Sequence, residues 1–279
     1  MDTLEYIKAK QKAWAKGKGL ELQGSKGERG DPIYTCRLDD NLFLKISNDT
    51  ALAFSKGDGN ELGDEKNIGK MQALHSSSAV GVNVFEYWKQ NGRLSIIAKA
   101  LRIPATKIET IEFERKFKAL ESSKFDPNVD LVFSYKDGSN IGIECKYTEP
   151  FQSRKVDLGL KEKYLVEYKY WNELRNIKKL ASKISPEDTT NSYFHSAQMI
   201  KHVLGMYAAT QDKSKVRLLY LYQPAFFENN CKYEEEISKF RDAVEADQIG
   251  FSSISWQEVI DNLSISADVS DKELSLIHI

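Results

Sequence analysis

The chain of 279 residues is 41% hydrophobic and 29% charged, which is ordinary for a globular protein with one large domain, or one domain and an elaboration. Its formal net charge of −1 argues against a protein that coats nucleic acid through a global positive field, although a locally basic cleft remains compatible with it. Three well-separated cysteines and four histidines without ligand spacing argue against a disulfide framework and a cysteine-based zinc site. Without a signal peptide or an apolar run of transmembrane length, the expected location is the cytoplasm.

The N-terminal part of the chain predicts a helix, a loop and two short strands. Residues 1–20 are rich in lysine and predict a helix that ends at Gly17 or Gly19, whose lysines either form a solvated face or contact phosphate. Glycine and polar residues make 23–32 a loop. Residues 33–36 and 42–46 have the composition of short strands.

Two helices are expected next. From Ser76 apolar residues recur at helical spacing as far as Trp88, with Ser76 to Ser78 as N-cap candidates, and Leu94 to Leu101 form a second, shorter helix. His75, just before the first of these helices, either takes part in catalysis or only fixes the entry of the chain into the helix.

Alternating apolar and charged residues between 111 and 117 predict the first strand of a sheet. Glu114 is the strongest candidate for an acidic ligand on this strand, followed by Glu112. The alternative is that both glutamates lie on an exposed strand face without a function.

Residues 127–146 carry the strongest local pattern and predict a β-hairpin. Apolar and polar residues alternate in both arms, and an Asp137-Gly138 pair lies in the turn between them. Side chains two apart in a strand share a face, so Glu144 and Lys146 point the same way. Pairing of the two arms brings Asp130 beside Glu144.

Two ionised carboxylates at close range repel each other, and a bound divalent cation removes that penalty. Oxygen ligands of this kind suit magnesium, which keeps its waters and takes one or two carboxylates. Lys146 could orient the attacking water or neutralise charge on the phosphate. The alternative is a solvated Glu-x-Lys pair that forms a weak ion pair. Glu149 belongs either to the rim of the site or merely to the loop after the hairpin.

Helices and strands continue beyond the hairpin. The stretch 161–183 is expected to be one long helical stretch. It mixes tyrosine and tryptophan with lysine and arginine, which indicates either a nucleic-acid surface or aromatic residues that pack inward beneath solvated lysines. The remaining elements are expected to be an apolar helix over 194–210, a buried fourth strand over 216–222, a surface helix over 234–246, a fifth strand over 251–256 and a closing helix over 256–263. The tail 274–279 has no inferred packing partner.

The hairpin residues resemble a known motif. Pro127 followed by Asp130, and then Glu144-Cys-Lys146 on the next strand, resembles the motif of the PD-(D/E)XK nucleases, the restriction-endonuclease-like superfamily. The proline and the aspartate are not adjacent, so the choice of Asp130 also uses strand geometry. Further blocks resemble a bacterial subfamily of these nucleases, and with them the resemblance covers roughly residues 35 to 225. These blocks are 70–85, Phe113-Glu114, 143–149 and 198–202.

The resemblance implies a mixed α/β fold, with a restriction-endonuclease-like central sheet flanked by helices. It divides the chain into an N-terminal elaboration (1–70), a nuclease core (71–232) and a C-terminal strand and helix extension of the same domain (233–279). In the resembled fold, a helix after the third strand packs on the sheet and can present a polar side chain to the site, for which Gln198 and Lys201 are the candidates.

The expected function is a magnesium-dependent endonuclease of the restriction type, which hydrolyses DNA phosphodiester bonds. The expected catalytic residues are Asp130, Glu144, Lys146, Glu114 and Gln198, and the expected Mg²⁺ ligands are Asp130, Glu144 and the backbone carbonyl of Cys145. The resemblance also suggests a homodimer and a methyltransferase encoded beside the gene. Two alternatives remain: a catalytically silent binding module of the same fold, and a nuclease directed at RNA.

Overall fold

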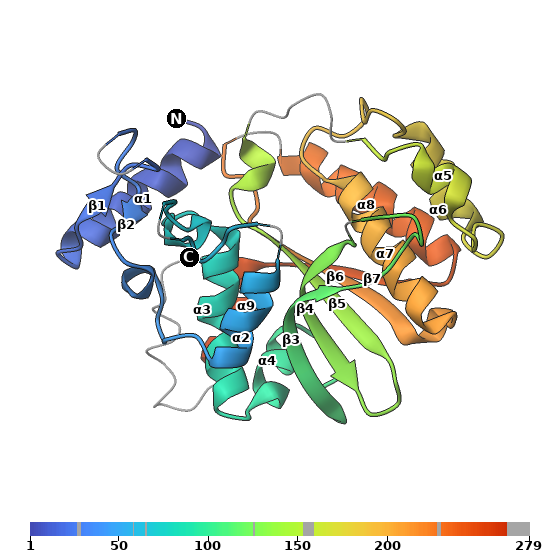
Figure 1. Cartoon of the computed structure of the whole chain (residues 1–279), viewed down its shortest axis with the longest axis horizontal. Helices are drawn as coiled ribbons and strands as arrows, with labels where there is room; N and C mark the ends of the chain where they lie inside the picture. The colour runs from blue at the N-terminus through green and yellow to red at the C-terminus, as the bar shows by residue number, and fades with distance from the viewer. Residues whose placement is uncertain are drawn as a thin grey trace.

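The computed structural model describes residues 1–26, 29–57, 59–64, 66–124, 126–152, 159–227 and 230–266. Its helices and strands, apart from short 3-10 turns, are drawn in Figure 1 and have these bounds: α1 Thr3–Gly17, β1 Leu22–Gln23, β2 Tyr34–Thr35, α2 Asn48–Lys56, α3 Ser77–Gln90, α4 Leu94–Ala100, β3 Ile108–Lys116, β4 Asn128–Tyr135, β5 Asn140–Lys146, α5 Lys163–Glu167, α6 Arg175–Lys183, α7 Ser196–Thr210, β6 Val216–Tyr222, α8 Asn230–Ala246, β7 Gly250–Ser255 and α9 Trp256–Ser266. The predicted hairpin is therefore present as β4 and β5.

The main sheet has five strands in the order β3-β4-β5-β6-β7. The first three strands are antiparallel, and Gly138 in the hairpin turn has a φ of 80°, which glycine adopts readily. Strands β5, β6 and β7 run parallel, and parallel neighbours need crossover connections. The chain between β5 and β6 contains α5, α6 and α7, and α8 connects β6 to β7. This mixed sheet flanked by helices confirms the predicted restriction-endonuclease-like α/β fold.

Helices cover both faces of the sheet (Figure 1). Helices α2, α3, α4 and α9 share one apolar core with the sheet, and α5 to α8 share the other. Helix α7 packs closely on β5 at Gly142. A Cβ added there would lie 2.8 Å from the sulfur of Met206 on α7 and 3.1 Å from Cδ2 of Leu218 on the neighbouring strand β6. This close approach brings the polar residues of α7 next to the hairpin strands.

The strand predicted over 42–46 was wrong, because side chains satisfy the backbone there instead of a neighbouring strand. Asn83 accepts a hydrogen bond from the backbone N–H of Phe43, and the side-chain amide of Gln90 donates one to the carbonyl of Lys45. A short pair, β1 with β2, forms earlier in the chain.

The stretch 161–183 forms two helices, α5 and α6, and not one. The indole N–H of Trp171 donates to the carbonyl of Tyr164 at 2.9 Å, so the chain folds back between the helices. Tyr164, Tyr168 and Trp171 are all buried, which favours inward packing over a base-stacking surface. Helix α8 also buries one side, although it was expected at the surface.

The predicted N-terminal helix is confirmed as α1, which Asp2 begins with a capping box that includes Glu5. The tail 274–279 lies outside the described residues. In the described part of the chain, no helix combines the length and apolar character needed to cross a membrane.

Candidate active site

The side chains of β4 change faces at one level of the sheet. Phe113 of β3 pairs with Leu131 of β4, and both pack on the α3 side. Val129 packs on the α7 side, so the regular alternation predicted for this arm of the hairpin was wrong between Val129 and Leu131. Glu114 has a φ of 52°, in the left-handed region, and interrupts regular strand geometry at this level. Glu114 and Asp130 therefore lie on adjacent strands where the alternation reverses.

Glu144 lies fully buried at the centre of a charged cluster. Its Oε1 is 2.6 Å from the ammonium of Lys146, and its Oε2 accepts a hydrogen bond of 2.9 Å from Nε2 of His202 on α7. Burial alone would raise the pKa of Glu144, but Lys146 and His202 outweigh it and lower that pKa to about 2. Glu144 is consequently ionised at neutral pH and oriented from two sides.

Asp130 lies near the start of β4, next to this cluster. Its Oδ2 accepts a hydrogen bond of 2.7 Å from the backbone N–H of Cys145, the residue between Glu144 and Lys146. Burial, followed by repulsion from Glu144, holds the pKa of Asp130 well above its usual range, and Lys146 acts in the opposite direction. Asp130 thus interacts electrostatically with both members of the Glu144–Lys146 pair.

Comparison with protein-family models gives a match over residues 8–275 to a family described as Restriction Endonuclease associating with ARP, or REase-ARP. The chain belongs to this restriction-endonuclease family. Comparisons with curated proteins and with solved structures give no match. The REase-ARP match includes the whole five-stranded sheet and the strands that carry Glu114, Asp130, Glu144 and Lys146.

A third carboxylate of this REase-ARP protein comes from β3. Glu114 accepts a hydrogen bond of 3.1 Å from the side-chain amide of Asn128, at the start of β4. Burial raises the pKa of Glu114 to about 7, aided by repulsion from Glu61 and Glu144 and opposed by the hydrogen bond from Asn128. Glu114 therefore takes part in the same electrostatic network as the hairpin acids.

The stability of the metal-free protein should fall as the pH rises from 4.5 to about 7. The unfolded chain releases the Glu114 proton near 4.5, whereas the folded chain keeps it until about 7, so the folded state binds more protons in this window. Urea unfolding should show a flatter decline for Glu114→Gln and an unaltered decline for Glu112→Gln, an exposed neighbour on the same strand. Equal slopes in wild type and Glu114→Gln would contradict this role of burial.

Glu61 and Glu149 extend the acidic side of the site. Glu149 accepts a hydrogen bond of 3.0 Å from the backbone N–H of Tyr147 and another from the hydroxyl of Ser77. Burial alone would lower the pKa of Lys146, but the charges of Glu144 and then of Glu149 raise it. Burial raises the pKa of Glu61. Sequence pattern carries no signal for Glu61, because folding brings it to the hairpin from a distant loop.

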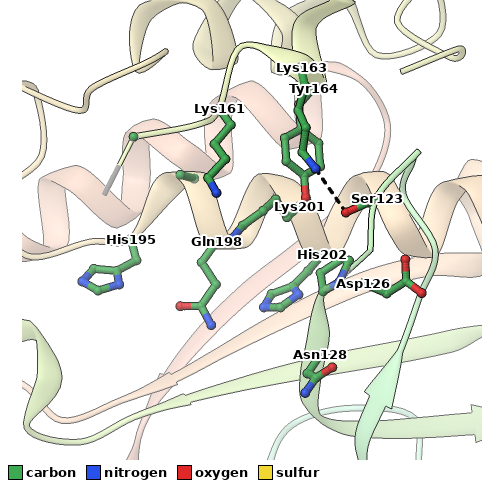
Figure 2. Close-up of a pocket in the computed structure, with 13 residues that line it drawn as sticks. Ser123, Asp126, Asn128, Lys161, Lys163, Tyr164, His195, Gln198, Lys201 and His202 are labelled. Carbon is green, nitrogen blue, oxygen red and sulfur yellow. Dashed lines mark hydrogen bonds between the residues drawn. The ribbon is translucent and has the colours of Figure 1, made fainter. Parts of the chain in front are cut away.

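Helix α7 presents His202 to the site, where the sequence analysis selected Gln198. Among the described residues, no hydrogen bond joins Gln198 to Glu144; Gln198 lies one turn before His202 and lines a neighbouring pocket (Figure 2). The fact that both residues share a helix face was the available signal, and it did not distinguish them. The roles of Gln198 and of the Cys145 carbonyl stay predictions.

His75 has a structural contact that accounts for its position. Its backbone carbonyl accepts a hydrogen bond from the Thr148 hydroxyl at 3.2 Å, directly before the N-cap Ser76 of α3. Burial, together with the charge of Lys8, lowers the pKa of the His75 imidazole to about 4. These contacts favour the interpretation that His75 fixes the entry of the helix.

The donor set suits a hard divalent cation held by two carboxylates. In the described residues, no group of three or more His, Cys, Asp or Glu stands in a metal-holding arrangement. Magnesium needs only one or two carboxylates, because it keeps several of its waters. Burial and then repulsion from ionised Glu144 raise the pKa of Asp130, and a bound cation would relieve that repulsion. Asp130 and Glu144 are therefore the side chains that fit the ion.

Proposed function

We propose that this chain is a magnesium-dependent endonuclease of the PD-(D/E)XK type that hydrolyses DNA phosphodiester bonds. Its membership of a restriction-endonuclease family supports the class of activity. The observation that carries the proposal is the pairing of buried, ionised Glu144 with Lys146 at 2.6 Å, with Asp130 hydrogen-bonded to the residue between them. A solvated ion pair on a strand face would be neither buried nor attached to a second acid.

Each residue of this cluster has a distinct role in the proposal. Asp130 and Glu144 would hold the ion, which supplies polarisation of the phosphate and a water of lowered pKa. Lys146 holds Glu144 in place and offers an ammonium to the negative charge that develops on the phosphate. His202 orients the second oxygen of Glu144. Glu114 adds a third acid that can accept a proton near neutral pH.

The direct test is cleavage of supercoiled plasmid DNA with magnesium and with EDTA, beside an RNA of matched sequence. Nicking or linearisation of DNA only with magnesium is expected. Cleavage that persists in EDTA would contradict the metal requirement, and preferred cleavage of RNA would support the RNA-directed alternative. DNA binding without cleavage under any metal condition would identify a silent binding module.

Magnesium should also stabilise the folded protein, because binding to the native state alone raises the free energy of unfolding by about 2.7 kcal/mol at a hundredfold excess over the dissociation constant. A thermal shift assay without DNA measures this effect independently of cleavage. Asp130→Asn should lose most of the shift. An equal shift in wild type and variant would place the ion elsewhere.

Partners are part of the proposal at a coarser level. The family description names an association with ARP, and an association of this chain with such a partner is proposed on that basis alone. A second copy of the chain and a methyltransferase of the same system remain expectations. Size-exclusion chromatography with light scattering tests the first, and inspection of the neighbouring genes tests the second.

A further inference from the structure

A pocket of about 470 Å³ lies beside the cluster, between α7, the start of α5 and the loop that joins β3 to β4 (Figure 2). Its volume falls within the usual range for small-ligand sites, about 300–1,000 Å³. His202 lines the pocket and also bonds to Glu144, so the pocket and the proposed catalytic cluster share a wall. A ligand in the pocket would thus sit next to the reacting phosphate.

One wall of this pocket is cationic. Lys161, Lys163 and Lys201 extend into it from α7 and from the start of α5 (Figure 2). Lys163 bonds to the hydroxyl of Ser123 at 3.3 Å, and Lys161 and Lys201 have no acidic partner among the described residues. Burial, and then repulsion from Lys161, lower the pKa of Lys201, with Glu144 acting in the opposite direction. Crowded ammonium groups of this kind are stabilised by an anion.

The opposite wall offers hydrogen-bond acceptors. The Oδ1 atoms of Asp126 and Asn128 are buried at the pocket and have no hydrogen-bond partner in the described part of the chain. Unpaired buried acceptors are costly, and a ligand with N–H or O–H groups would satisfy them. A bare inorganic anion would match the cationic wall alone.

We propose that this pocket binds one nucleotide of the DNA strand adjacent to the scissile bond, with its phosphate on Lys161, Lys163 and Lys201. Donor groups of the base or of a strand-end hydroxyl face Asp126 and Asn128. The assignment rests on the proposed nuclease function, since it names a substrate position next to the same Glu144. The bound nucleotide fixes the register of the strand relative to the cleavage site.

The test measures DNA binding without metal, in EDTA, by fluorescence anisotropy over a range of salt concentrations. Each phosphate that the protein neutralises adds about one unit to the slope of log affinity against log salt. Because the proposal places a single phosphate on these lysines, the double variant Lys161→Gln/Lys201→Gln should lower this slope by about one unit. Lys99→Gln, an exposed lysine of α4 on the other face of the sheet, is the matched control and should leave the slope unaltered. An unaltered slope in the double variant would overturn the proposal.

A second measurement separates the sources of the phosphate. Titration of the wild type with inorganic phosphate and with deoxynucleoside monophosphates should show tighter binding of the nucleotides, and Asp126→Ala should remove the difference. Equal binding in the wild type would overturn the nucleotide assignment. Oligonucleotides with and without a terminal phosphate are then compared. Tighter binding with the terminal phosphate identifies a strand end as the occupant of the pocket, and equal binding identifies an internal phosphate.

These measurements also separate this inference from the proposed function. If the pocket does not bind a nucleotide, the double variant has the same salt slope as wild type while metal-dependent cleavage of DNA is still observed. Failure of the nuclease assignment leaves a protein that does not cut DNA, whose lysine variants still change the slope. The Lys161→Gln/Lys201→Gln variant loses two of three crowded ammonium groups and therefore their mutual repulsion. It should remain folded, which thermal unfolding can verify.

Discussion

Replacing Asp130 by Asn should lower the rate of DNA cleavage by roughly a hundredfold or more while the protein stays folded. The substitution keeps the size of the side chain and its ability to accept the hydrogen bond from Cys145. It removes the negative charge that would hold the metal beside Glu144. Initial rates of plasmid nicking at saturating magnesium measure the effect.

The matched control is Asp137→Asn, because Asp137 is an exposed acid of the same hairpin whose turn accepts asparagine equally well. The control should cleave at the wild-type rate. Asp130→Asn should unfold in EDTA at a temperature no lower than that of wild type, because it removes a repulsion with Glu144. Cleavage by Asp130→Asn at the wild-type rate would remove the basis for assigning Asp130 to the metal.

The second large effect is on stability. Lys146→Met should lower the free energy of unfolding at neutral pH by about 3–5 kcal/mol, the usual cost of leaving a buried charge without its partner. Glu144 has no exposed surface, and without Lys146 the hydrogen-bond partner that remains for its carboxylate among the described side chains is His202. Urea unfolding measures the loss, and Lys136→Met, at an exposed lysine of the hairpin turn, is the control.

Acid should reduce the difference in the free energy of unfolding between Lys146→Met and wild type. The pKa of Glu144 is lowered from 4.5 to about 2 in the folded protein, so the stability that this group contributes is present above 4.5 and is lost as the pH falls toward 2. Lys146→Met already lacks most of this stability contribution of Glu144 at neutral pH, so it has less to lose in acid. The double variant Lys146→Met/Glu144→Leu should recover much of the neutral-pH loss, because an apolar pair replaces the unpaired charge. A double variant no more stable than Lys146→Met would contradict this account of the pair.

Short-range sequence pattern determined the hairpin and the common face of Glu144 and Lys146. Period-two alternation and an Asp-Gly turn act over a few residues, so they hold whatever the rest of the chain does. The same reasoning anticipated the five strands of the sheet and most of the helices that flank it. It also selected Asp130, although its position near Cys145 depends on the reversal of faces near Glu114.

Tertiary structure alone decided which residues of other elements join the cluster. The periodicity of a helix shows which residues share a face, but the rotation of that face against a sheet depends on packing between distant residues. The close approach of α7 to Gly142 of β5 brings His202 and not Gln198 to Glu144, across 58 positions of sequence. The pocket lined by Lys161, Lys163 and Lys201 likewise joins α7, the start of α5 and the loop between β3 and β4, which no local sequence pattern relates. The raised pKa of Glu114 is also decided by tertiary structure. Its largest cause is burial, and burial depends on the whole enclosing structure and not on neighbours in the chain.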